Sequence, residues 1–212
     1  MGKVIANITT SVDGYVAGPD DGPGCGLGVG GERLHHWVFG GPWTYGNEPD
    51  GQMSGADKEY FDQVNARMGA VIAGRSTYDA AEAWGGSNPW PTPFFIVTHR
   101  TDDEPEGAGF TFVDDLDTAI AQAREAAGDK DVLVMGGADV IRQALASGVV
   151  EELGISVAPV VLGAGRALFD GFDQDMELSP VSVHQSAFAT HVWYVVDRQS
   201  AGAAQSSAST EQ

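Results

Sequence analysis

The chain has 212 residues, of which 42% are hydrophobic, so it fits one domain with a substantial core. Its 30 Asp and Glu against 11 Lys and Arg give a formal net charge of −19, which disfavours nucleic acids and anionic membranes as partners. The single cysteine, Cys25, excludes an internal disulfide framework and a cysteine-rich zinc site, and the lack of a long apolar run and of a signal-peptide pattern predicts a cytoplasmic protein.

The N-terminal part combines one predicted strand with a long loop. Residues 3–9 (KVIANIT) are rich in β-branched side chains and stop before the turn Asp13-Gly14, which predicts a strand. Residues 18–54 are heavy in Gly and Pro, and loops of such length inside a compact domain usually serve a function. We expect residues 20–54 to form a mobile lid over a substrate site.

Three aromatic side chains lie in this loop, namely Trp37, Phe39 and Trp43. They could stack on a flat heteroaromatic substrate or anchor the loop to the core, and anchoring is slightly favoured. The adjacent His35 and His36 do not predict a metal site, because neighbouring side chains point in different directions and no carboxylate follows at ligand spacing.

The rest of the chain alternates predicted helices and strands. Helices are expected at 56–67, from Thr77 onward, at 115–127 and at 138–147, and strands at 69–73, 94–98, 110–113, 131–135, 152–161, 178–186 and 190–197. The alternation favours parallel pairing, and the helix-poor end favours antiparallel strands at one edge. The sequence therefore predicts an α/β fold over residues 1–198, with a central, mixed, mostly parallel sheet flanked by helices. Residues 199–212 lack apolar periodicity and are expected to be a disordered tail.

Three predicted strands end in residues suited to binding an anion or an amide. The first strand end continues into residues 74–78 (GRSTY), the second into residues 98–100 (THR) and the third into residues 136–138 (GGA). Glycine lets a ligand approach the backbone, and a helix N-terminus presents free N–H groups to a phosphate. Ligands of α/β sheets collect at the carboxyl ends of strands. The three ends together indicate an extended ligand with several phosphates, such as a dinucleotide.

Glycines at any one of these ends could equally serve a tight turn, but three such ends, two of them with Arg75 or Arg100, favour a binding site. Residues 26–31 (GLGVGG) also match the dinucleotide fingerprint G-x-G-x-x-G, which is meaningful only between a strand and a helix. Here the pattern follows residues of turn type, so we assign it no cofactor role.

The three strand ends, in this order, resemble those of a known superfamily. Residues 74–78 resemble the glycine-arginine-x-threonine-aromatic motif of dihydrofolate reductases, and residues 134–137 (VMGG) resemble their second glycine motif. The opening, residues 5–18 (IANITTSVDGYVAG), and residues 157–165 (VAPVVLGAG) resemble riboflavin-biosynthesis reductase domains and their stand-alone relatives. The resemblance spans residues 3–197 and implies a dihydrofolate-reductase-like three-layer fold.

The resemblance also implies an NADPH-dependent reductase and a set of cofactor contacts. Arg75, Ser76 and Thr77, beside Gly74, would contact the cofactor phosphates, and Thr98, His99 and Arg100 would contact the adenosine ribose and its 2′-phosphate. The pyrophosphate would be bound by Gly136, Gly137, Ala138 and Asp139. The nicotinamide would be contacted by Ala17 and Gly18. Asp139 departs from the pattern, because some dihydrofolate reductases carry Arg there and a carboxylate cannot hold a phosphate. Arg75 and Arg100 must then supply the positive charge, which predicts that NADPH is preferred over NADH.

Asp57 is the candidate catalytic residue. Dihydrofolate reductases carry a carboxylate early in the helix before the first glycine motif, and Asp57 resembles that residue with an offset of one position. The pattern Ser54-x-x-Asp57 is also a capping box, and an acidic side chain in a first helical turn is favoured by the helix dipole. We favour the capping role. His191, in the last predicted strand, is expected to be a satisfied structural group.

The function implied by the resemblance is hydride transfer from NADPH to a C=N or C=O bond of a small pteridine-, pyrimidine- or glycosylamine-like substrate, similar to the reduction of 5-amino-6-ribosylaminouracil. Two alternatives remain open: a true dihydrofolate reductase, and a non-catalytic NADP(H)-binding or sensor protein. The resemblance further implies a homodimer.

Overall fold

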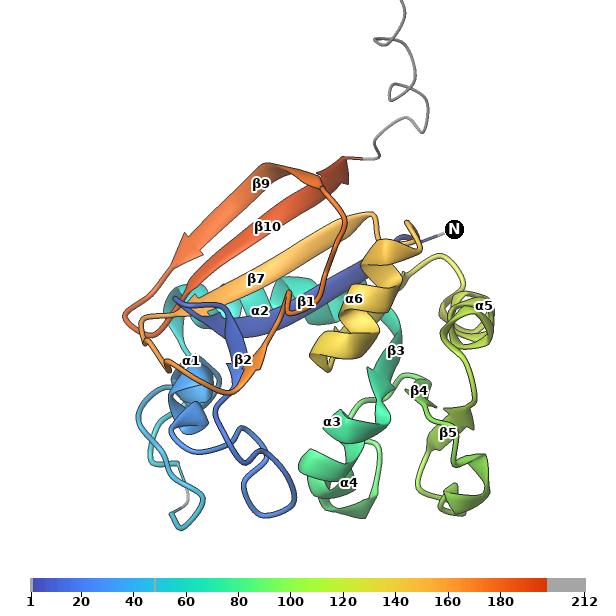
Figure 1. Ribbon diagram of the computed structural model, residues 1–212, viewed down its shortest axis with the longest axis horizontal. Helices are drawn as coiled ribbons and strands as arrows, with labels where there is room; N and C mark the ends of the chain where they lie inside the picture. Colours follow the sequence, from blue (N-terminus) through green and yellow to red (C-terminus); the bar gives the residue numbers. More distant parts are fainter. Residues whose placement is uncertain (1, 48, 198–212) are drawn as a thin grey trace, which may run out of the picture.

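The computed structural model describes residues 2–47 and 49–197, and the predicted tail at residues 199–212 lies outside them. An eight-stranded sheet runs through the centre of the molecule (Figure 1), in the order β5-β4-β3-β6-β1-β7-β10-β9. The first six strands of this order are parallel, and β10 and β9 follow as antiparallel neighbours. The predicted mixed sheet with an antiparallel C-terminal edge is confirmed.

The strands begin and end close to the predicted positions. They are β1 (Val4–Ser11), β3 (Met68–Gly74), β4 (Phe94–Val97), β5 (Phe110–Val113), β6 (Asp131–Gly136), β7 (Glu152–Ala158), β9 (Glu177–Gln185) and β10 (Thr190–Asp197). The largest difference is in β7, which ends at Ala158 instead of residue 161.

Alternating side chains of the strands pack against two layers of helices. In β1, Val4 and Ala6 belong to one core cluster with α5 (Leu116–Ala127) and α6 (Ala138–Ala146). Ile5, between them, belongs to a second cluster with Tyr60 of α2 (Gly55–Arg67). Successive residues of a strand point to opposite faces, so a strand covered on both faces is hydrophobic throughout. These two clusters make the three-layer fold that the resemblance implies.

The segment at residues 20–54 contains helical turns that the sequence did not predict. They are η1 (Gly31–His35) and α1 (His36–Phe39). Leu34 and Trp37 are buried, and Trp37 Nε1 donates a hydrogen bond to Thr9 Oγ1 at 3.1 Å. Residues 31–39 are thus helical turns within the predicted Gly-rich stretch, and two apolar side chains fix them to the sheet. Trp37 has the anchoring role that was favoured.

Shorter elements connect the strands near the carboxyl edge of the sheet. β2 (Tyr15–Ala17) pairs with β8 (Arg166–Ala167) in a separate two-stranded sheet. Two short helices, α3 (Arg75–Ala80) and α4 (Glu82–Gly86), lie between β3 and β4, and η2 (Thr101–Asp103) follows β4. In Figure 1, α3 and α4 extend beyond the end of β3, on the same side of the molecule as α1.

The strand order explains why the three predicted strand ends can act together. β4, β3 and β6 are adjacent and parallel in the sheet. Their carboxyl ends, at Val97, Gly74 and Gly136, therefore lie side by side along one edge.

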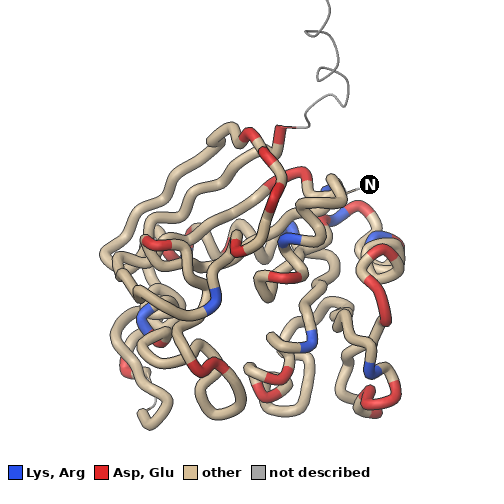
Figure 2. The backbone as a smooth tube through the Cα atoms, in the orientation of Figure 1, with Lys and Arg blue, Asp and Glu red and all other residues tan. Residues whose placement is uncertain are grey.

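Charges are spread over the surface of the molecule. Figure 2 shows Lys and Arg dispersed among more numerous Asp and Glu residues. Within residues 2–47 and 49–197, every helix is too short or too polar to span a bilayer.

Candidate cofactor and substrate site

A cavity of about 870 Å³ lies beside the carboxyl ends of β1, β3 and β6. Ser76 and Thr77 of the first predicted strand end, Gly136 and Gly137 of the third, and Ala17 all line it. The remaining wall is rich in aromatic side chains from residues 35–45, from α2 and from α4. The cavity thus joins two glycine-containing strand ends to an apolar chamber.

The first and third strand ends approach each other closely at the cavity wall. A Cβ atom placed on Gly137 would lie 3.0 Å from Thr77 Oγ1 and 3.7 Å from Ser76 Oγ. Gly137 is the N-cap residue of α6, and no side chain caps that helix, so the N–H groups of its first turn have no capping acceptor. Two hydroxyl groups and a helix N-terminus therefore face one region without side-chain bulk, which fits a phosphate group.

Gly74 has a different reason to be glycine. A Cβ atom there would lie 2.8 Å from Val140 Cγ2, so the lack of a side chain lets α6 pack against the end of β3. Gly74 does not line the cavity. Its contribution to the site is to permit this close packing of α6 on β3.

Arg75 and Arg100 share acidic partners. Arg75 donates from Nε to Asp79 Oδ1 at 2.7 Å and from Nη1 to Asp103 Oδ2 at 3.3 Å, and Arg100 Nη2 donates to Asp79 Oδ2 at 3.2 Å. Burial lowers the pKa of Arg75, but the hydrogen bonds and negative charges of Asp79 and Asp103 outweigh it, so the pKa is raised. Two guanidinium groups are thus held together at the first and second strand ends, with two carboxylates between them.

Asp57 does not cap its helix. Ser54, the N-cap residue of α2, makes no side-chain capping bond, and the Asp57 carboxylate turns inward, with Oδ1 2.8 Å from His191 Nε2. Asp57 is 3% exposed and His191 is fully buried. The capping prediction is therefore wrong, because the Asp57 carboxylate is hydrogen-bonded to a buried imidazole of β10 instead of to the start of its own helix.

His191 joins Asp57 to a second buried polar group. Its Nδ1 lies 2.7 Å from Ser156 Oγ. Burial lowers the pKa of His191 and outweighs the hydrogen bond and charge of Asp57, so the imidazole is neutral near pH 7. In that form Nε2–H donates to Asp57 and Nδ1 accepts from the Ser156 hydroxyl. The prediction that His191 is a satisfied structural group is confirmed.

Tyr60 separates the hydrogen-bonded side chains of Asp57, His191 and Ser156 from the cavity. Its ring stacks on His191 with centroids 4.2 Å apart, and its hydroxyl accepts a hydrogen bond from Asn7 Nδ2 at 2.8 Å. Tyr60 and Asn7 line the cavity, whereas Asp57 does not. Burial raises the pKa of Tyr60 to about 12 and outweighs the opposing effect of its hydrogen bonds with Ser156 and Asn7, so the hydroxyl stays protonated.

Comparison with known proteins identifies the family of the chain. A model of the RibD C-terminal domain family matches residues 2–192. The chain belongs to the RibD C-terminal domain family.

The similar proteins match most of the chain at low sequence identity. The protein YwjB of Bacillus subtilis (strain 168) is 22% identical over 193 residues, which cover 91% of this chain and 97% of YwjB. A Shewanella sp. PV-4 protein named for riboflavin biosynthesis has a TM-score of 0.68 at 22% identity, covering 93% of this chain and all of that one. Dihydrofolate reductase from Enterococcus faecalis, solved with NADP(H), has a TM-score of 0.54 at 14% identity, covering 93% and 98%.

The remaining predicted contacts are not part of the cavity wall. Thr98 is buried, and its Oγ1 accepts a hydrogen bond from Arg100 N at 3.1 Å, while His99 is exposed. Ala138 is buried in the core, and Asp139 forms an ion pair with Arg142. That pair moderates the negative charge that Asp139 brings to the start of α6.

Gly18 is held by the loop that follows it. Its N–H donates to the Leu27 carbonyl at 2.7 Å, and a Cβ atom there would lie 2.2 Å from the Val29 carbonyl oxygen. The Gly18 carbonyl oxygen packs against Gly28, where a Cβ atom would lie 2.2 Å from it, so of this predicted pair only Ala17 lines the cavity. Among the described residues, His, Cys, Asp and Glu side chains form no group of three or more that could ligate a metal.

Stability should fall in mild acid because of His35, which lines the cavity. Burial lowers the pKa of His35 to about 4, below its unfolded value of 6.5. Between these values the unfolded state binds more protons, so the free energy of unfolding should drop as pH falls from 6.5 to 4, by up to about 3 kcal/mol. Urea denaturation of the parent and of His35→Gln at pH 7 and pH 5 measures this, and the variant should lose less stability between the two pH values. An equal loss in both proteins would assign the acid sensitivity to other groups.

Proposed function

We propose that this chain is an NADPH-dependent reductase that transfers a hydride to a C=N or C=O bond of a small pteridine-, pyrimidine- or glycosylamine-like substrate. The observation that carries the proposal is the shared cavity, where Ser76, Thr77 and the start of α6 adjoin an aromatic chamber. A phosphate-bearing cofactor and a flat substrate need these two kinds of surface next to each other.

Bound NADPH would supply the hydride, and the chain would supply binding and orientation. Ser76, Thr77 and the N–H groups at the start of α6 would hold phosphates, while Arg75 and Arg100 would hold the 2′-phosphate. Dihydrofolate reductase from Enterococcus faecalis, whose fold this chain shares, was solved with NADP(H), which supports this cofactor. The aromatic wall would pack against the faces of a flat substrate.

Tyr60 and Asn7 orient the substrate in this proposal. Both line the cavity, and their mutual hydrogen bond fixes the Tyr60 hydroxyl, which stays protonated. Asp57 stands outside the cavity wall, so it acts on the substrate only through the ring of Tyr60 and the imidazole of His191. The substrate proton would then come from solvent.

The proposal is tested by cofactor titration followed by turnover. Calorimetry should show NADPH binding, and loss of NADPH absorbance should follow addition of a ribosylaminouracil or a pterin. Absence of NADPH binding would contradict the reductase assignment. Oxidation driven by dihydrofolate alone would identify a dihydrofolate reductase, and binding without any oxidation would identify a non-catalytic NADP(H)-binding protein.

We also propose that the chain forms a homodimer through β9. This strand lies at the edge of the sheet, and Val181 and Val183 on it are 61% and 62% exposed. An edge strand with exposed apolar side chains favours pairing with a second chain. Light scattering should give twice the chain mass, and Val183→Lys should shift the mass towards one chain. A single-chain mass for the parent at all micromolar concentrations would contradict the dimer.

A further inference from the structure

We propose that the substrate held in this cavity is an uncharged, planar heteroaromatic ring that bears no phosphate or carboxylate group. This inference rests on the proposed reductase function and narrows it to one class of substrate.

The cavity wall offers no spare positive charge to an anionic substrate. Among its described lining residues, the acidic side chains are Asp21 and Glu82, and Arg166 is the only Lys or Arg. Arg166 is already paired with Asp21, donating from Nε and Nη2 to its two carboxylate oxygens at 3.1 Å each. Glu82 accepts a hydrogen bond from the N–H of Gly24 at 2.8 Å. A phosphate in the chamber would therefore have to break an ion pair and would meet a wall with one net negative charge.

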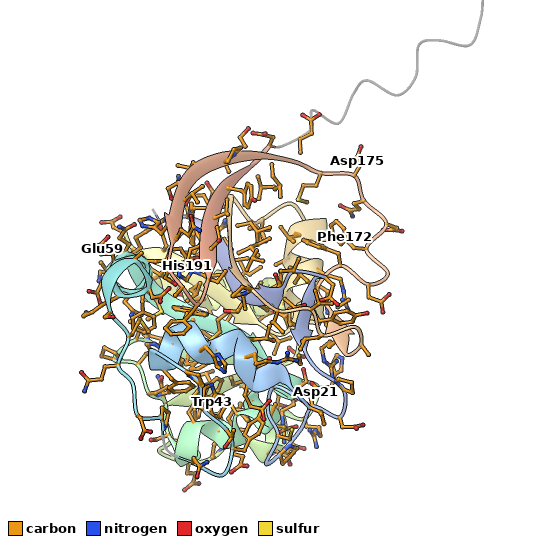
Figure 3. All side chains as sticks on the ribbon, turned by 90° about the vertical axis from the view of Figure 1, so that its left-hand side faces the viewer. Asp21, Trp43, Glu59, Phe172, Asp175 and His191 are labelled. Atoms are coloured by element: carbon orange, nitrogen blue, oxygen red, sulfur yellow. The ribbon has the colours of Figure 1, made fainter. Side chains whose placement is uncertain are left out.

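The chamber wall is instead built for stacking. Its aromatic members are Trp37, Phe39, Trp43, Tyr45, Tyr60, Phe61, Trp84 and Trp90. Ring centroids of Phe39 and Trp43 are 4.9 Å apart, and those of Trp84 and Trp90 are 5.8 Å apart, so the rings support one another. Figure 3 shows Trp43 and Asp21 towards the same end of the molecule, away from His191. Surfaces of this kind bind the faces of flat rings.

Apart from Asp21, Glu82 and Arg166, the polar side chains of the chamber are uncharged. Trp43 Nε1 is buried and has no hydrogen-bond partner among the described residues. A buried N–H without an acceptor is unfavourable, so a ligand acceptor that reached this position on binding would satisfy it. His35, Asn7 and Asn65 add neutral groups, because burial keeps the pKa of His35 at about 4. A ring with carbonyl and N–H groups on its edge matches this set.

The test compares two rings that differ by one charge. Pterin and pterin-6-carboxylate are titrated into protein saturated with NADP⁺, with calorimetry as the readout. We expect pterin to bind at least tenfold more tightly. Equal or tighter binding of the carboxylate would overturn the proposal, and so would failure of both rings to bind. Binding of NADP⁺ itself is measured first in a separate titration. Failure of that titration would count against the reductase assignment, whereas failure of the pterin titration alone would count against the substrate inference.

Two sets of variants connect the result to named groups. Asp21→Asn releases Arg166 from its partner, so it should raise affinity for pterin-6-carboxylate severalfold and leave pterin affinity within twofold.

Trp43→Phe and Trp90→Phe each replace one chamber indole by a phenyl ring, but only the first removes the unpartnered donor. Trp43→Phe should weaken pterin binding by roughly fivefold more than Trp90→Phe, the scale of one hydrogen bond. Equal losses would show that Trp43 Nε1 does not contact the ring.

Discussion

Asp57→Ala is expected to lower the free energy of unfolding by about 3 kcal/mol, because it removes a hydrogen bond to a charged group and leaves a buried space beside His191. For a domain of this size the melting temperature should fall by about 6–12 °C. Thermal denaturation measures the effect. Asp62→Ala is the matched control on the same helix, since Asp62 is 58% exposed and pairs with Lys58 at the surface. That pair is worth less than about 1 kcal/mol.

The same variant separates a structural from a catalytic carboxylate. Asp57 is not part of the cavity wall, so the reduction rate per folded molecule should change by less than tenfold. Loss of a general acid would lower it by about 10²–10⁴-fold, and the loss would shrink at low pH. A hundredfold lower rate with an unchanged melting temperature would contradict the structural role and make Asp57 the proton donor.

Arg75→Ala should weaken NADPH binding by about 1.5–3 kcal/mol, the range for a hydrogen bond to a charged group, and weaken NADH binding much less. The difference arises because only NADPH carries the 2′-phosphate that Arg75 and Arg100 are proposed to hold. Calorimetric titration of both cofactors measures it. Equal losses for the two cofactors would contradict the assignment of Arg75 to the 2′-phosphate.

A reciprocal variant tests the acidic partners of these arginines. Asp103 accepts a hydrogen bond from Arg75 at 3.3 Å, so part of the Arg75 charge is already neutralised in the free protein. Asp103→Asn should therefore tighten NADPH binding and leave NADH binding unchanged. Weaker NADPH binding in this variant would mean that Asp103 orients Arg75 rather than competing for it.

The order of elements could be predicted because strands and helices carry strong local patterns. β3 is hydrophobic throughout and is followed by Arg75-Ser76-Thr77, and a glycine pair follows β6 in the same way. The two motifs also gave the resemblance that the family match confirms. The local pattern and the family motif therefore agreed at the strand ends, where the backbone geometry restricts which residue types fit.

The candidate site was less predictable because its contacts join distant parts of the chain. His191 lies 134 positions after Asp57, and no local pattern relates them. Asp79 could have been noticed, since it follows Arg75 by four residues, a spacing that brings side chains together on a helix. Asn7 offered a second signal, as a polar residue inside a hydrophobic strand. The capping box around Asp57 was misleading because two roles share one sequence pattern.

The aromatic chamber and the strand ends that we propose to bind phosphate come from different parts of the fold. Phe39, Trp43 and Tyr45 lie before α2, in a connection outside the sheet, whereas Gly136 and Gly137 join β6 to a helix that packs on it. Substitutions and length changes in such a connection leave the strands undisturbed. Under the proposed function, substrate choice could therefore diverge in this fold while the cofactor site stays unchanged. Exchanging residues 40–47 between relatives should transfer selectivity for one substrate without a new cofactor site having to be built.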